Sequence, residues 1–156
     1  MSAALWLFVL AHGLAKVSMF LAAGEMQATL VSRRVSALKG ATQTMPVAMF
    51  AFAVAGGSLI GLPPSGGFLA KWVLLMPLFE DPMHWPWAFA VLVGTLASAA
   101  YVFRVVALSF DRADPKPPGY DPDSFAQWLA LLPALGGWGM ALIAEPLMLW
   151  LAEMQL

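Results

Sequence analysis

Five apolar runs, separated by short polar segments, dominate the chain. They cover residues 3–23, 45–62, 68–79, 85–110 and 125–151. A helix needs about 20 residues to cross the hydrocarbon core of a bilayer, so four of these runs are long enough or nearly so. The third run is too short to cross by itself. The pattern predicts an all-α, polytopic membrane helical bundle that forms a single transmembrane domain over residues 1–156.

The segment between the second and third runs is predicted to interrupt helical structure. Proline lacks a backbone donor and clashes with the carbonyl four residues earlier, so the two prolines are expected to free the carbonyls of Leu59 and Ile60. The glycines permit an unwound backbone. Irregular backbone within a membrane is tolerated where protein buries it or water lines it, as at the ion sites of transporters. The predicted helix break covers residues 61–67 and consists mainly of Gly61, Pro63, Pro64, Gly66 and Gly67.

Loop charges favour joining the second and third runs into one discontinuous crossing. In that topology residues 24–44 and 111–124 lie on the same side, and they carry Arg33, Arg34, Lys39, Arg112 and Lys116. The linker at residues 80–84 has neither Lys nor Arg. Because cytoplasmic loops are enriched in positive charge, we predict four crossings, both charged loops in the cytoplasm and both termini outside. The expected location is the inner or plasma membrane of a prokaryote.

Composition narrows the function classes. The chain is 61% hydrophobic and 11% charged, whereas soluble domains have about 25% charged residues. Its net charge of −1 offers no basic surface, so nucleic-acid binding is excluded. The absence of cysteine excludes disulfides, thiolate iron–sulfur ligation and a thiol nucleophile. His84 lies in a predicted loop, so a bis-histidine haem would need a second chain, and we expect no cofactor and no bound metal.

Lys16 is the strongest candidate for chemistry because it lies well inside the first apolar run. A lysine at the centre of a membrane helix costs about 2.5 to 3.5 kcal/mol on insertion scales and is by default a functional hypothesis. His12 precedes it by four residues and shares its helix face. Lysine and histidine can both exchange protons near neutral pH when buried, so the pair forms a candidate relay. The alternative is that Lys16 only binds a carboxylate of a partner subunit.

Three further ionisable residues enter the candidate site. Lys71 follows the helix break, where freed carbonyls would hold water beside its amine. The alternative is that Lys71 reaches out to lipid headgroups at the interface. Arg104 and Glu145 are possible charge partners, although each lies close enough to a helix end for a structural role to be the better interpretation. The predicted proton-transfer residues are therefore His12, Lys16 and Lys71.

Three motifs now point to a known family. Residues 12–24, HGLAKVSMFLAAG, resemble the H-x-x-x-K-x-x-x-F-L-x-x-G helix of the antiporter-like subunits shared by respiratory complex I, Mrp-type Na+/H+ antiporters and membrane-bound hydrogenases. Residues 61–72, GLPPSGGFLAKW, resemble the family's G-[LIM]-P-P-x-x-G-F-x-x-K element. Residues 101–104, YVFR, are similar to its Y-x-x-R helix.

The resemblance implies roles for both lysines. Lys16 would correspond to a central-axis lysine, and Lys71 to the ionisable residue on the discontinuous helix of the second half-channel. Family members contain two inverted repeats of helices, and the chain resembles only the last part of the second. The resemblance therefore implies a second polypeptide that supplies the N-terminal helices, or a truncated or split gene product.

We expect a membrane subunit that translocates protons, with possible Na+/H+ antiport, and performs no bond-making chemistry. It would work with other membrane subunits of an NADH-quinone oxidoreductase-like, hydrogenase-like or Mrp-like complex. The alternative is a non-conducting structural module, or a truncated product, that holds a larger complex together. A quinone-reducing enzyme ranks third, because neither a hydride-carrier site nor a metal site is visible.

Overall fold

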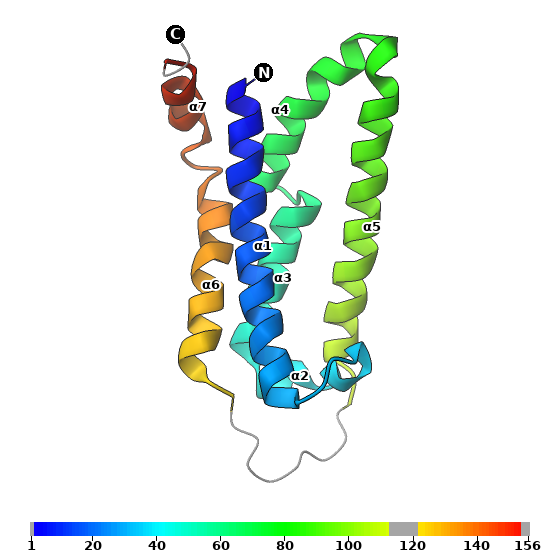
Figure 1. The fold of residues 1–156 in the computed structure, drawn as a ribbon, viewed down its shortest axis with the longest axis vertical. Coiled ribbons are helices and arrows are strands. Elements are labelled where there is room, and N and C mark those ends of the chain that lie inside the picture. Colours follow the sequence, from blue (N-terminus) through cyan, green and yellow to red (C-terminus); the bar gives the residue numbers. More distant parts are fainter. Residues whose placement is uncertain (1, 113–121, 154–156) are drawn as a thin grey trace.

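The apolar runs form helices that lie side by side along one long axis (Figure 1). The computed structural model describes residues 2–112 and 122–153, and every regular element within these ranges is helical, which confirms the all-α class. The elements are α1 (Ser2–Leu30), η1 (Val35–Leu38), α2 (Ala41–Thr44), α3 (Pro46–Ile60), α4 (Gly66–Glu80), η2 (Pro82–His84), α5 (Trp85–Ser109), α6 (Ser124–Gly139) and α7 (Ala144–Glu153). Part of the predicted loop at residues 111–124 lies outside the described ranges.

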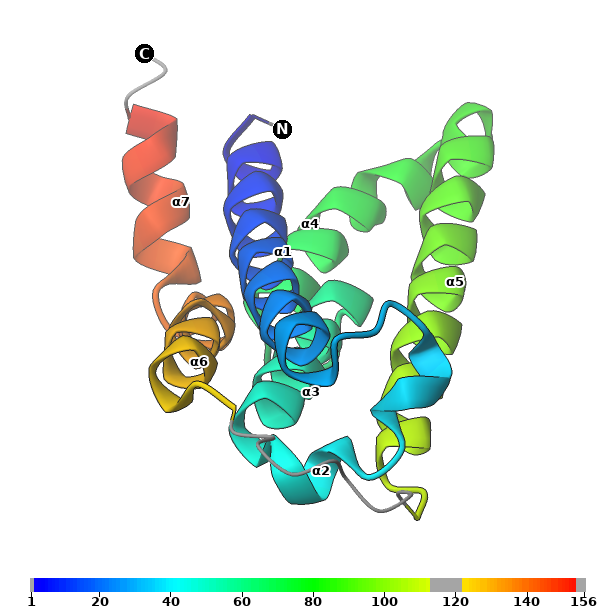
Figure 2. The ribbon, with the colours of Figure 1, turned by 60° about the horizontal axis from the view of Figure 1, so that its bottom comes forward.

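The first, third and sixth helices form the packed centre of the bundle. Figures 1 and 2 both place α6 and α7 on one side of α1 and α5 on the other. Small side chains allow membrane helices to approach closely, and the fully buried positions here include Ala15, Ala22, Ala48, Ala51, Ala55, Ala130 and Ala134. The fifth helix packs against α3 and α4. A Cβ added to Gly56 would lie 2.6 Å from Val102 Cγ1, so this glycine sets how closely α3 and α5 meet.

The break between α3 and α4 is shorter than predicted. The third helix ends at Ile60, and Gly61 takes a left-handed conformation with φ of +90°. Its N–H donates to the carbonyls of Gly57 and Ser58 at 3.0 and 3.1 Å, as in a common type of helix ending. The fourth helix starts after Ser65, whose hydroxyl accepts the backbone N–H of Phe68 at 3.1 Å. The non-helical segment is therefore residues 61–65.

Gly66 and Gly67 are helical, which corrects the prediction that they unwind the backbone. Both are needed for close packing instead. A Cβ on Gly67 would clash with the carbonyl of Ser58, and one on Gly66 would lie 2.7 Å from the carbonyl oxygen of Gly137. The first turn of α4 thus contacts α3 and α6 through backbone atoms.

The last apolar run is also divided. Its helix α6 contains Pro133 and ends at Gly139, and α7 then departs at an angle of 77°. Asp123 begins α6, since its carboxylate accepts the backbone N–H groups of Phe125 and Ala126. Pro133 does not end this helix, and the turn follows Gly139.

Among residues 2–112 and 122–153, two helices are long and apolar enough to cross a membrane, namely residues 4–30 and 82–109. The bent pair α6 and α7 would make a third span if the two helices act together. The third helix is apolar but shorter. Figure 1 places the start of α1, the turn at η2 and helix α7 at one end of the bundle, with η1, α2 and the start of α6 at the other.

Candidate functional site

Lys71 closes the gap left by the helix break. It lies in α4, half-buried, and its Nζ donates to the carbonyl oxygens of Leu59 at 2.8 Å and Ile60 at 3.0 Å. These are the carbonyls that the prolines were expected to free. A third bond runs from Nζ to Thr95 Oγ1 of α5 at 2.9 Å. An ammonium has three N–H donors, so all three have acceptors here, and the negative end of the α3 dipole favours the positive charge.

His12 and Lys71 line one small cavity. Its volume is about 10 Å³, and it is lined by Phe8, His12, Ser58, Leu59, Gly67 and Lys71. The His12 ring is partly buried and stacks on Phe8, with 5.5 Å between ring centroids. Three helices therefore converge here, α1 with the histidine, α3 with its broken end and α4 with the lysine.

Lys16 does not line this cavity. Its side chain is exposed on α1, and Nζ lies 6.0 Å from the ring centroid of Phe20 on the same helix. No hydrogen bond or ion pair joins it to another residue in the described ranges. Lys71 therefore shares a cavity with His12 and Lys16 does not; the pairing of His12 with Lys16 stays a prediction.

Arg104 and Glu145 lie apart from both lysines. Arg104 is exposed near the end of α5 and lines a cavity of about 430 Å³ with Ser36 and Asp111. Glu145 is exposed in the first turn of α7, toward the opposite end of the bundle (Figure 1). Within residues 2–112 and 122–153 neither forms an ion pair, and the single pair found there joins His84 to Asp81 at 3.7 Å.

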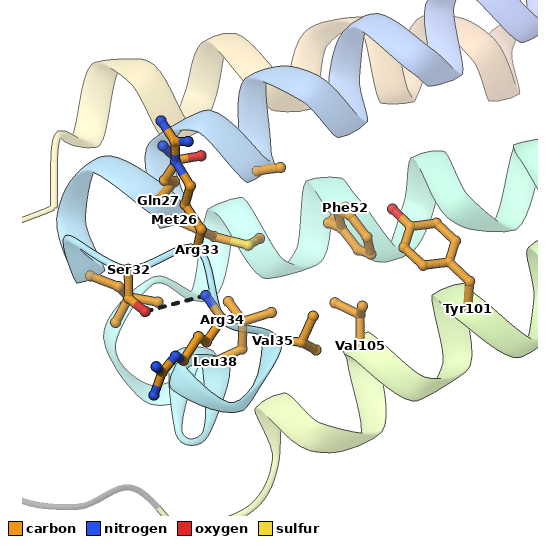
Figure 3. A pocket seen from close by; sticks show the side chains of 12 residues that line it. Met26, Gln27, Ser32, Arg33, Arg34, Val35, Leu38, Phe52, Tyr101 and Val105 are labelled. Carbon is orange, nitrogen blue, oxygen red and sulfur yellow. Dashed lines mark hydrogen bonds between the residues drawn. The ribbon is translucent and has the colours of Figure 1, made fainter.

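A larger cavity lies near η1 and shares no residue with the Lys71 cavity. Its volume is about 250 Å³. Figure 3 shows apolar side chains from α1, α3 and α5 along its wall, with Arg33 and Arg34 beside it. The backbone N–H of Arg34 donates to Ser32 Oγ at 3.3 Å. No predicted site residue lines this cavity.

The sequence interpretation did not identify Ser58, Thr95 or Trp138. Each has a polar group inside an apolar run, and this is the one sequence signal by which they could have been found. Trp138 Nε1 donates to the carbonyl oxygen of Val54 at 2.8 Å. Thr95 and Ser58 matter for the site only because the fold places them near Lys71. Thr95 on α5 accepts a hydrogen bond from Lys71, and Ser58 on α3 lines the same cavity as Lys71.

Comparisons with known proteins agree with the motifs. A family described as "NADH:quinone oxidoreductase/Mrp antiporter, TM" matches residues 1–98. NADH-quinone oxidoreductase subunit N of Desulforudis audaxviator is 38% identical over 111 residues, which are 71% of this chain and 22% of that protein. Subunit N of Cereibacter sphaeroides is 40% identical over 94 residues, covering 58% and 21% of the two chains. F(420)H(2) dehydrogenase subunit N of Methanosarcina mazei is 30% identical over 109 residues, covering 64% and 22%.

The chain thus spans about a fifth of the length of these relatives. No solved structure matched it. The family match covers well over half of the chain and includes the first helix, the helix break and Lys71. The protein is therefore a helical membrane protein that belongs to the NADH:quinone oxidoreductase/Mrp antiporter transmembrane family.

Proposed function

We propose that this chain forms part of a proton-translocating subunit in a redox-driven membrane complex related to NADH-quinone oxidoreductase. One observation carries the proposal. A lysine with three hydrogen bonds occupies the gap at a helix break and shares a cavity with a histidine. The relatives are named as subunits of NADH-quinone oxidoreductases and of an F(420)H(2) dehydrogenase, which supports assignment to a complex of this kind.

In the proposed topology the chain crosses the membrane four times. The crossings are α1, the pair α3 and α4, α5, and the pair α6 and α7. The alternation of helix ends along the long axis supports this arrangement (Figure 1). Both termini would lie outside a prokaryotic cell membrane, with the loops that carry Arg33 and Arg112 in the cytoplasm, as the positive-inside rule favours.

Lys71 is the residue that takes up and releases the proton. When it is charged, two carbonyls and the Thr95 hydroxyl accept its three N–H groups. When it is neutral, its nitrogen carries a lone pair that needs a donor. Carbonyls cannot donate, but a hydroxyl can rotate and do so. Thr95 can therefore satisfy both protonation states, and neither state leaves a buried group without a hydrogen bond.

His12 is the proposed exchange partner of Lys71 on the α1 side of the cavity. Lys16, which faces outward, would exchange protons with groups beyond these residues. An exposed lysine on a membrane helix is costly unless protein or water covers it. We therefore assign the surface of α1 around Lys16 to contact with other helices of the subunit or with a neighbouring membrane subunit.

A structural role is the second candidate, and the same bonds favour it. Three acceptors around Lys71 are enough to make it a fixed cap on the end of α3. Arginine separates the two functions because it can also cap carbonyls but does not release its proton near neutral pH. The test is proton transport by Lys71→Arg and Lys71→Met in the assembled complex, reconstituted in proteoliposomes.

Both variants are expected to assemble and to lose most proton transport per electron transferred. Lys39→Arg, a change of the same kind at an exposed loop position, is the matched control and should transport normally. Wild-type transport by assembled Lys71→Arg would refute the proton-transfer role and leave the structural cap.

A further inference from the structure

We infer that the Ser58 hydroxyl holds one water molecule between His12 and Lys71. Ser58 would then be a positioning residue for proton exchange, and this inference rests on the proposed function. Ser58 is 2% exposed and lines the 10 Å³ cavity that both residues share. Among the described residues, its Oγ is the one buried side-chain polar atom without a hydrogen-bond partner. Such atoms are rare in folded proteins, because each lost bond is costly.

The unpaired hydroxyl has a local cause. A serine in a helix commonly donates to the carbonyl three or four residues earlier, as Ser98 does to the Gly94 oxygen at 2.8 Å. For Ser58 the carbonyl four residues earlier is that of Val54. In the helix it accepts the backbone N–H of Ser58, and it also accepts Trp138 Nε1 at 2.8 Å. A carbonyl oxygen has two lone pairs, so both are occupied at Val54. The Ser58 hydroxyl does not bond the carbonyl of Ala55, three residues earlier, either, because it has no hydrogen-bond partner.

The surroundings of Ser58 suit a water better than a side chain. A Cβ on Gly67 or Gly137 would lie 3.1 or 3.5 Å from Ser58 Oγ, so the neighbouring helices present bare backbone there. A cavity of about 10 to 15 Å³ admits one water, which needs two to four polar partners. The Ser58 hydroxyl and the His12 ring supply two. Lys71 supplies a third when one N–H turns from the Leu59 carbonyl toward the water.

This arrangement connects the two titrating groups without moving either helix. An N–H proton of the Lys71 ammonium passes to the water while the water passes one of its own protons to an imidazole nitrogen of His12. The lysine becomes neutral, the histidine becomes an imidazolium, and the water is unchanged. The hydroxyl of Ser58 holds the oxygen of the water in line for both transfers.

The test compares Ser58→Ala with Ser98→Ala in the assembled complex. Both changes remove one hydroxyl from a helix, but the Ser98 hydroxyl donates to the Gly94 carbonyl oxygen of its own helix and not to the cavity. Ser58→Ala should assemble and transport protons about five to ten times more slowly, as the loss of one hydrogen bond predicts. Ser98→Ala should transport at the wild-type rate. Unchanged transport in Ser58→Ala would overturn the inference.

A structural measurement keeps the inference testable if Ser58→Ala fails to assemble. A high-resolution structure of the wild-type complex should show water within hydrogen-bond distance of Ser58 Oγ and of His12, and a site without water would refute the assignment. The lysine variants separate the two levels of proposal. If Lys71→Arg abolishes transport and Ser58→Ala does not, only the water assignment fails; if Lys71→Arg is fully active, the proposed function fails first.

Discussion

At the scale of single residues, the half-buried amine of Lys71 has three hydrogen-bond acceptors. Two carbonyls come from a helix end, where they have no partner within the helix. The third acceptor is a hydroxyl from a neighbouring helix. Unlike the carbonyls, the hydroxyl of Thr95 can reverse its role, and this property yields a test.

Thr95→Val should impair proton transport, and Thr95→Ser should preserve it. Valine has nearly the shape of threonine but cannot accept from the ammonium or donate to the amine, whereas serine can do both. We expect a severalfold loss for valine, because one charge-assisted hydrogen bond is removed. The measurement is the pH profile of proton transport by the assembled complex, which should shift in Thr95→Val. An unshifted profile with full activity would show that Thr95 only packs against α4.

Sequence reasoning reached part of this site. Local chemistry predicted the freed carbonyls of Leu59 and Ile60, since proline acts on its own helix, and the role of Lys71 stays a prediction. It did not predict that Lys71 would bind those carbonyls, because this depends on how α4 folds back. It also paired His12 with Lys16 from a spacing of four residues. That pairing stays a prediction. Lys71 shares a cavity with His12 because of how α1 packs on the other helices, and that packing depends on small buried residues such as Ala11 and Ala15.

At the scale of elements, close backbone contacts fix the position of the break between α3 and α4. The first turn of α4 approaches α3 so closely that Gly67 has no room for a side chain. The sequence indicated a break here but extended it over both glycines, because glycine is equally compatible with unwound and tightly packed backbone. Only the neighbouring helices distinguish the two uses.

Gly67→Ala should destabilise the bundle, because the added methyl group would clash with the backbone carbonyl of Ser58, which cannot rotate away as a side chain could. Overpacking of this kind costs about 1 to 3 kcal/mol. Gly94→Ala is the control, since an added Cβ there meets nothing within 4 Å and alanine favours the helix. Thermal denaturation of the detergent-solubilised complex would compare the two. A Gly67→Ala complex as stable as the Gly94→Ala complex would contradict the close approach.

At the scale of the whole molecule, contacts near one end join segments that are far apart in the sequence. Glu25 Oε1 accepts the backbone N–H of Asp123 at 2.7 Å, and Thr42 Oγ1 donates to the carbonyl oxygen of Ser109 at 2.8 Å. Gln127 Oε1 accepts the backbone N–H of Ala48 at 3.2 Å. These bonds fix the end that carries η1 and α2, which the proposed topology places at the cytoplasmic face.

Cysteine labelling can test that topology, since the chain has no cysteine of its own. Ser36→Cys and Ser124→Cys should react only with reagents on the cytoplasmic side. Met83→Cys, in the turn at η2 and 77% exposed, should react only from outside. These outcomes follow if α3 and α4 share one crossing. Labelling of Ser36→Cys and Ser124→Cys from opposite sides would mean that α3 and α4 each cross separately.

The break also determines how the membrane voltage would act on the site. The two helices on either side are both 15 residues long, so in a shared crossing the break falls near its middle. The charge of Lys71 sits there, because its Nζ reaches the end of α3. A charge that crosses the full membrane potential gains or loses about 2.3 kcal/mol per 100 mV, so a proton reaching Lys71 from either face would exchange about half of that. Loading and release of this lysine would therefore share the electrical work of translocation almost equally.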